Sequence, residues 1–460
     1  MAARIINIPE KSMNYIERYV ERIEYFLSHE WNAEARDAAR KCLLDYSAVL
    51  IAGSRQLAQR HSAYLAAFDG KGSSLIAGMH ARADEYTACL LNGMSAHTLE
   101  LDDGHRYGML HPSVPVISPL LAILEKENIS AENFLRGIAA GYEAMIRLAC
   151  MIQPNHTKKG FFATATCGTV GAAVGISVAR EYPHEQLLAA VSAALTSAAG
   201  ISEMMTGDSE LLPYNAAKAG LNGLVAANIA YCCYKGPEDA LGGKKGFIQA
   251  FNGSVNDEKF ESAIEMSGCL FKVYRKAYAS HRQVHPPVEA ALFIRKDNGI
   301  KPEEIKKVYV STYDLAVFGH DSSEIHSISA AKMSIPYTVA VALLYGKAGL
   351  DAFTQDLVQD EKVQKLARKI KVAVSSELSA LVPEKRAALV TVICSDGSEY
   401  IRRVDYPKGE PENPLSDDEM YEKVRDLMVY ARRSPKEAKK LIDAVSSIDD
   451  DISAYLKMLR

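Results

Sequence analysis

Residues 161–178 read FFATATCGTVGAAVGISV, and residues 216–230 read AAKAGLNGLVAANIA. Both stretches are apolar around almost their whole circumference and are longer than ordinary buried strands, so they predict buried helices. Alanine and glycine dominate the second stretch, which lets neighbouring backbones approach closely. Residues 114–124 and 187–199 have the same character. Together these segments predict a core of packed helices.

The helical pattern extends from about residue 12 to about residue 268 and then changes. Residues 308–313 and 371–375 are rich in β-branched and aromatic side chains, which favours strands. Residues 388–394 and 399–404 flank the sequence Ser-Asp-Gly-Ser, which is typical of a β-hairpin turn. Helical patterns at 287–295, 337–346 and 361–369 are interspersed. This region predicts a smaller α+β unit.

Proline and glycine cluster at residues 407–414, and helical sequence resumes beyond them. Ser416 and Glu419 have the spacing of a capping box, which predicts the start of a new helix. We therefore expect a mainly α fold. A large all-helical domain, made of residues 1–270 and the tail 409–460, would carry an inserted α+β domain at 271–408.

The composition excludes several classes of protein. Of the 460 residues, 48% are hydrophobic and 24% are charged, which is ordinary for a globular chain, and the net charge of −4 gives no basic surplus for nucleic acid or anionic membranes. No apolar run is long enough to span a bilayer, and residues 1–10 lack the apolar segment of a secretory signal. The eight cysteines are scattered, as in a reduced protein. We expect a cytoplasmic location.

The densest polar segment is 97–113, HTLELDDGHRYGMLHPS. Its histidines and carboxylates suit either acid–base chemistry or a metal site. His97, His105 and His111 lack the i, i+4 spacing of a helical zinc site, so the pattern favours no metal. The alternative is a charged helix end that runs into a solvated loop.

Three further features are candidates for a site. Residues 275–285, RKAYASHRQVH, are rich in cations and suit an anionic ligand, or else form a basic surface loop. Lys218 lies among small residues. If it is buried, it needs an anionic partner; the alternative is that its side chain extends to the surface. Tyr337 offers a phenol proton, or else is a half-buried tyrosine at a helix start. No phosphate-binding glycine motif is present, which disfavours a nucleotide cofactor.

These clusters, in this order, resemble the MmgE/PrpD family, which includes 2-methylcitrate dehydratase, cis-aconitate decarboxylase and iminodisuccinate epimerase. The resemblance rests on Leu-Asp-Asp…His-Pro-Ser at 101–113, Ala-Thr-Cys-Gly-Thr-Val-Gly at 165–171, Ala-Ala-Lys-Ala-Gly at 216–220, Lys276…His281 and Ser334…Tyr337. It implies a helical domain capped by an α+β lid. It also implies a homodimer, and a reaction that needs no cofactor and no metal.

The resemblance further implies a pocket at the domain interface. Its catalytic residues would be His111, Lys218, His281, Tyr337 and Asp102, and its substrate-binding residues would be Asp103, Lys276, Arg275 and Phe162. The lysines would neutralise the carboxylates of a di- or tricarboxylate, and a neutral imidazole of His111 or His281 would act as the base. Tyr337 or the other histidine would deliver a proton.

The chain also departs from the family pattern. Phe162 stands where decarboxylase-like members carry a histidine, and Glu100 and Gly104 stand where those members have Asp and Thr. One extra residue precedes His111. We therefore expect a lyase, most concretely a dehydratase of a 2-methylcitrate-like hydroxy-polycarboxylate. The alternatives are an epimerase of a small dicarboxylate that uses the same carbanion, and an inactive ligand-binding relative.

Overall fold

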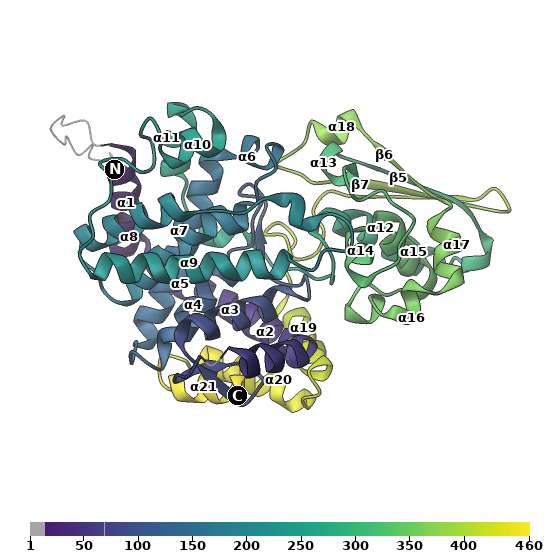
Figure 1. Cartoon of the computed structure of the whole chain (residues 1–460). Helices are drawn as coiled ribbons and strands as arrows, with labels where there is room; N and C mark the ends of the chain where they lie inside the picture. The colour runs from purple at the N-terminus through teal and green to yellow at the C-terminus, as the bar shows by residue number, and fades with distance from the viewer. Residues whose placement is uncertain (1–13, 69) are drawn as a thin grey trace.

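The computed structural model describes residues 14–68 and 70–460, and most of them are helical (Figure 1). The long helices of the N-terminal part are α1 (Tyr15–Tyr25), α2 (Ala33–Ala67), α3 (Glu85–His97), α4 (Ser113–Leu124), α5 (Ala131–Ile152), α7 (Ala163–Ala179), α8 (His184–Ser197) and α9 (Leu212–Tyr231). Shorter helices are α6 (Asn155–Lys158), α10 (Phe247–Asn252) and α11 (Asp257–Glu265). The expectation of a mainly α fold is confirmed.

Helix α7 lies at the centre of this part and packs against α5, α8 and α9. All its residues except Val178 are buried, as its sequence predicts. Glycines bring α5 and α7 into backbone contact: a Cβ at Gly171 would stand 2.8 Å from the carbonyl oxygen of Gly141, and the reverse distance is 2.7 Å. The small residues therefore set the spacing of the core helices.

The α+β part, residues 271–408, lies on one side of the helical part (Figure 1). Its sheet has the order β6 (Ile370–Val374), β5 (Ile305–Thr312), β7 (Ala388–Cys394), β8 (Glu399–Val404), with β5 and β6 parallel and the other pairs antiparallel. The predicted hairpin is β7–β8, and Gly397 at its turn has φ of 89°, a left-handed conformation that suits glycine. The helices are α12 (His285–Asn298), α13 (Asp314–Val317), α14 (Ile328–Met333), α15 (Ile335–Tyr345), α16 (Gln355–Val358), α17 (Glu361–Ala367) and α18 (Ser376–Ser379).

The C-terminal tail forms α19 (Asp417–Tyr430), α20 (Pro435–Ser446) and α21 (Ile452–Leu459). The capping box of Ser416 and Glu419 is present as predicted. Both α19 and α20 pack on α2, so the tail lies against the N-terminal helices. That the α+β part acts as a lid stays a prediction, as do the exact domain boundaries.

Within the described residues, no helix is both long and apolar enough to cross a membrane. The expectation about residues 1–10 concerns a segment that lies entirely outside the described residues.

Candidate active site

The loop 98–112 connects α3 to α4 and carries most of the candidate site. Two small strands join it to the segment that holds the second cluster: β3 (Gly104–His105) pairs with β4 (Val273–Tyr274). This pairing brings Lys276 beside Asp102, although the two are far apart in sequence. A Cβ at position 104 would meet the Tyr274 hydroxyl oxygen at 2.2 Å, which explains the glycine there.

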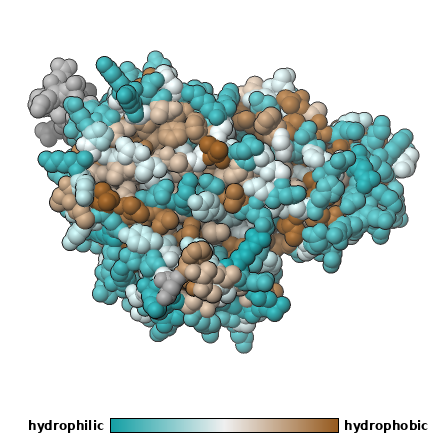
Figure 2. Space-filling view, viewed as in Figure 1, coloured by the Kyte–Doolittle hydropathy of each residue, from teal (hydrophilic) through white to brown (hydrophobic). Residues whose placement is uncertain are grey.

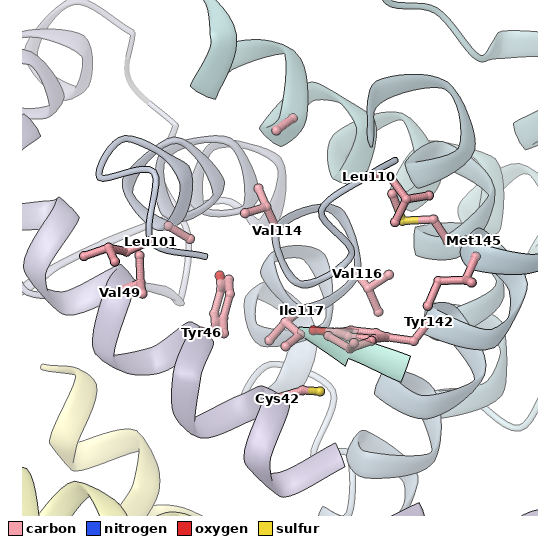
Figure 3. Packing of buried hydrophobic residues seen from close by; sticks show 14 of the residues in the cluster. Cys42, Tyr46, Val49, Leu101, Leu110, Val114, Val116, Ile117, Tyr142 and Met145 are labelled. Atoms are coloured by element: carbon pink, nitrogen blue, oxygen red, sulfur yellow. The ribbon is translucent and has the colours of Figure 1, made fainter. Parts of the chain in front are cut away.

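Two buried apolar side chains fix the loop 98–112 to the helical core. Figure 3 shows Leu101 near Val49 of α2 and Leu110 near Met145 of α5. Both leucines are buried in the main core. The polar residues between them are therefore held by packing on both sides.

Asp103 fixes the end of the loop. Its two carboxylate oxygens accept hydrogen bonds from the Ser113 backbone N–H at 3.1 Å and the Tyr142 hydroxyl at 2.7 Å. Pro112, at the N-cap of α4, gives no side-chain cap, so Asp103 supplies the missing acceptor. Both oxygens of this predicted substrate ligand are thus occupied by protein donors.

Five buried residues form what we call the acid–base cluster: His97, Glu100, Asp102, His111 and Lys276. The His97 Nδ1 lies 2.7 Å from Asp102 Oδ2, and the His111 Nδ1 lies 3.4 Å from the same oxygen. His111 Nδ1 is also 2.6 Å from the carbonyl oxygen of Asp103, which can only accept, so Nδ1 carries the proton. The other ring nitrogen, Nε2, is then a free acceptor.

The two histidines of the cluster differ in how tightly they hold a second proton. Burial lowers the pKa of His111 to about 4, and the Asp102 carboxylate only partly opposes this. Burial also disfavours the charged form of His97, but Asp102 at 2.7 Å outweighs it and the pKa of His97 is raised. His111 is therefore a neutral imidazole near pH 7, and His97 holds its proton more tightly.

Lys276 is 1% exposed and donates to the Glu100 carbonyl at 3.0 Å, with a Glu100 carboxylate oxygen at 3.2 Å. A second lysine, Lys332 on α14, donates to the Thr98 carbonyl at 3.2 Å and is 6% exposed. Burial lowers its pKa to about 8, although Glu100 opposes this. Burial disfavours an ionised Glu100 as well, but Lys276 prevails and holds the pKa of that carboxyl well below its usual range.

His281 extends the site toward the α+β part. Its ring stacks on that of His320 with centroids 4.6 Å apart, and its backbone N–H donates to the Lys332 carbonyl. Its Nδ1 is buried without a hydrogen-bond partner among the described residues. Burial lowers the pKa of both rings, that of His281 strongly.

A cavity of about 260 Å³ opens beside these groups, between α2, α3, the start of α9 and α14. Thr98, Glu100 and Lys332 line one side of it, and Met204, Met205 and Leu212 line another. The space is large enough for a small organic acid. A ligand bound in this cavity would face the Glu100 carboxylate and the Lys332 ammonium group.

The structure brings Asp102, His111, Lys276 and His281 together, but other predicted site residues lie apart. Tyr337 donates its hydroxyl to the Ala352 carbonyl at 2.8 Å, inside the α+β part. Lys218 is half-buried on α9 and, within the described part of the chain, has no hydrogen bond or ion pair with the acid–base cluster.

Two further predicted residues have other neighbours. The Arg275 guanidinium reaches Cys42 Sγ at 3.4 Å. Phe162 is the N-cap residue of α7 and packs with Ala165 and Met204 in a small apolar group, close to the cavity that Met204 lines.

The sequence interpretation missed His320 and Lys332. Lys332 follows two alanines, as Lys218 does, so the triplet Ala-Ala-Lys occurs twice in the chain. That repeat is a signal that could have found it. His320 sits in a loop without any motif. Among residues 14–68 and 70–460, no three His, Cys, Asp or Glu side chains are arranged to hold a metal ion.

Fold and site together define a mainly α protein with a buried histidine–carboxylate–lysine cluster where helical and α+β parts meet. The chain belongs to the MmgE/PrpD family: residues 16–259 match its N-terminal domain and residues 278–449 its C-terminal domain. It is 26% identical over 455 residues to a cis-aconitate decarboxylase-like protein, oryM, of Aspergillus oryzae, covering 93% of each chain. It is 23% identical to cis-aconitate decarboxylase of Homo sapiens over 81% of this chain and 79% of that one.

Proposed function

We propose that this protein is a lyase that acts on a small polycarboxylate without a cofactor, most concretely a dehydratase of a 2-methylcitrate-like hydroxy acid. The observation that carries the proposal is the neutral His111 in a buried cluster with Lys276, next to a cavity that Glu100 of the same cluster and Lys332 line. The matched relatives, which are named as a cis-aconitate decarboxylase and a decarboxylase-like protein, support lyase chemistry.

The first step would be removal of a proton from the carbon next to a carboxylate. His111 Nε2 is the acceptor, because Nδ1 is held by the Asp103 carbonyl. The charge that develops on the substrate carboxylate would be stabilised by Lys276. Asp102 would stabilise the imidazolium that forms on His111, since the two groups are 3.4 Å apart.

The second step would be loss of the hydroxyl group from the adjacent carbon. The electron pair of the broken C–H bond forms the C=C bond, and the C–O bond breaks as the oxygen takes a proton and leaves as water. Lys332 is the best-placed donor, because it lines the cavity and its pKa of about 8 keeps it protonated near neutrality. Tyr337, whose hydroxyl is used by Ala352, is less suited.

A second candidate is decarboxylation, because the relatives named above are cis-aconitate decarboxylase and a decarboxylase-like protein. Loss of CO₂ would leave a carbanion that the same lysines stabilise. Dehydration is put first because Phe162 stands where, by the family resemblance, decarboxylase-like members carry a histidine, so this chain lacks that side chain.

Proton NMR in deuterated buffer, with a panel of hydroxy-, imino- and unsaturated polycarboxylates, tests the proposal. Growth of a vinyl signal with loss of a hydroxy acid is expected and would name the substrate. Loss of CO₂ from an unsaturated acid would replace dehydration by decarboxylation. Deuterium entering the α-carbon without net conversion would identify an epimerase, and no change with any acid would contradict the lyase proposal.

Two variants assign the base. His111→Gln should lower kcat by about 10²-fold or more, since a positioned general base contributes 10²–10⁴. His184→Gln on α8, whose side chain is half-exposed and pairs with Glu24, is the matched control and should leave kcat unchanged. Equal activity of the two variants would exclude His111 as the base.

A further inference from the structure

A second cavity lies on another side of the junction between the helical and α+β parts, and its lining is strongly cationic. The cavity has a volume of about 620 Å³. Four cations line it: Lys158 of α6, Lys259 of α11, Lys272 at the end of the 3-10 helix Cys269–Lys272, and Arg386 before β7. Asp314 is the carboxylate in the lining.

These four cations have no carboxylate partner within 4 Å among the described residues, although ion pairs are frequent elsewhere on the chain. The buried acid whose charge acts on Arg386, Glu410, is already paired with Arg106 and Arg282. The cavity therefore concentrates positive charge that the protein itself does not neutralise.

Arg386 is the buried member of this set. It is 4% exposed, it donates to the Arg106 carbonyl, and its Nε has no hydrogen-bond partner in the described part of the structure. Burying a guanidinium without a carboxylate is costly, and the cost falls when an anion is bound to it. Burial lowers the pKa of Arg386, as expected of a cation that lacks such a partner.

The geometry points to a binding site for a small polyanion, with at least two carboxylate or phosphate groups, in this second cavity. Arg386 would hold one group through its guanidinium, and the flexible Lys158 and Lys272 would reach the other. Lys259 is partly engaged, since it donates to the Gln153 carbonyl. Leu315 and Val382 give the cavity an apolar wall for the body of the ligand.

Such a ligand would connect the two parts of the chain and contact the catalytic loop. Lys158 and Lys259 belong to the helical part, and Lys272 and Arg386 to the α+β part. The loop 98–112 contributes Tyr107 and Met109 to the cavity wall, between Asp103 and His111. Arg386 and Gln153 also bind carbonyl oxygens of that loop, so an anion here would touch the segment that positions the acid–base cluster.

Isothermal titration calorimetry on the full chain tests this site, with inorganic pyrophosphate and citrate as separate probes. One of them should bind with a stoichiometry of one and raise Tm. The double variant Lys158→Gln/Lys272→Gln, which alters exposed side chains only, should weaken binding about tenfold. The control Lys244→Gln/Lys245→Gln alters two exposed lysines outside the cavity lining and should bind as the parent does.

Two outcomes would overturn the site. One is no binding of either probe at millimolar concentration. The other is binding that survives Lys158→Gln/Lys272→Gln but is lost in Lys332→Met, which would assign it to the cavity of the candidate active site. Binding that weakens in Lys158→Gln/Lys272→Gln and persists in Lys332→Met supports the proposal; if pyrophosphate alone binds in this way the ligand is a phosphate, and if citrate alone does so it is a carboxylate.

Discussion

Glu100 contacts Lys276 through its carboxylate and lines the same cavity as Lys332. Its backbone has φ of 57°, in the left-handed region, and its N–H donates to the His97 carbonyl. This conformation turns the side chain of a non-glycine residue toward the two lysines at a cost of order 1 kcal/mol. We infer that the carboxylate occupies the lysines in the absence of substrate.

The variant Glu100→Gln should therefore lower the pKa of Lys332 below about 8, because Glu100 is the stronger of the two carboxylates, with Asp102, that raise it. Titration of ¹³Cε-labelled lysines by NMR, with Lys332→Arg to assign the signal, measures this. Glu210→Gln is the control, since Glu210 lines the same cavity but pairs with Arg60. A Lys332 titration that is identical in Glu100→Gln and the parent would show that the two groups do not interact.

Asp103 makes the stability of the protein depend on pH. Burial, reinforced by Asp45, raises its pKa to about 7, whereas an aspartate in the unfolded chain titrates near 4. Between these values the folded state keeps a proton that the unfolded state has lost, so this group's contribution to stability falls as pH rises from about 4 to about 7. The loss amounts to a few kcal/mol.

In Asp103→Asn this dependence should disappear, because the amide keeps an acceptor for the Ser113 N–H and does not ionise. Urea unfolding of both proteins at pH 5 and pH 8 gives the free energy of unfolding at each pH. The change in this free energy between the two pH values is then compared between Asp103→Asn and the parent. Asp450→Asn, at an exposed position, is the control and should follow the parent. An equal change in the free energy of unfolding for Asp103→Asn and the parent would contradict the assignment of the pH dependence to Asp103.

At the scale of residues, the family resemblance implied one pocket for Asp102, His111, Lys276 and His281, and the β3–β4 pairing explains why Lys276 meets Asp102. The repeated Ala-Ala-Lys triplet could have singled out Lys332 as a candidate, but it carries no information on the distance of Lys332 from the cluster, and His320 has no motif at all. Tyr337 illustrates the converse: its motif is present, but its hydroxyl is bound to the Ala352 carbonyl.

At the scale of elements, the contact between α5 and α7 depends on glycine. An alanine at Gly171 would improve helix propensity by about 1 kcal/mol. Its Cβ would, however, lie 2.7 Å from Met145 Cβ and 2.8 Å from the Gly141 carbonyl oxygen, so the two backbones must separate. Overpacking of this kind costs 1–3 kcal/mol or more and outweighs the propensity gain.

Gly171→Ala should therefore destabilise the protein by about 2 kcal/mol, measured as the change in the free energy of unfolding by urea. Gly349→Ala is the matched control, because its Cβ would meet only the exposed Asp351 side chain at 3.3 Å. A Gly171→Ala variant as stable as the control would show that α5 and α7 separate without cost.

Elements defined by local sequence were predictable, and their arrangement was not. The β7–β8 hairpin and the capping box of α19 depend on neighbouring residues, and both are present. The sheet order β6-β5-β7-β8, with β5 parallel to β6, depends on pairing between distant segments. No local pattern specifies which strands pair or in which register, because several strands present similar apolar faces.

At the scale of the whole molecule, one side of α9 exposes apolar side chains. Val225 is 44% and Ile229 41% exposed, and helical periodicity places both on the same face as Lys218. Tyr231 and Tyr234, at the end of the helix and beyond it, are 67% and 66% exposed. Figure 2 shows apolar residues along the surface that α9 crosses. A patch of this kind is typical of an interface.

We propose that this face of α9 forms the contact of the expected homodimer, so that Lys218 lies at the subunit boundary rather than in the acid–base cluster. Light scattering after size exclusion should give the mass of a dimer for the parent protein and of a monomer for Val225→Asp/Ile229→Asp. A buried aspartate without a partner costs several kcal/mol, and symmetry places each substitution twice in the interface. Ile401→Asp, at 59% exposure on the edge strand β8, is the control and should remain dimeric. If Ile401→Asp alone becomes monomeric, the sheet edge and not α9 is the interface; a monomeric parent would exclude the dimer itself.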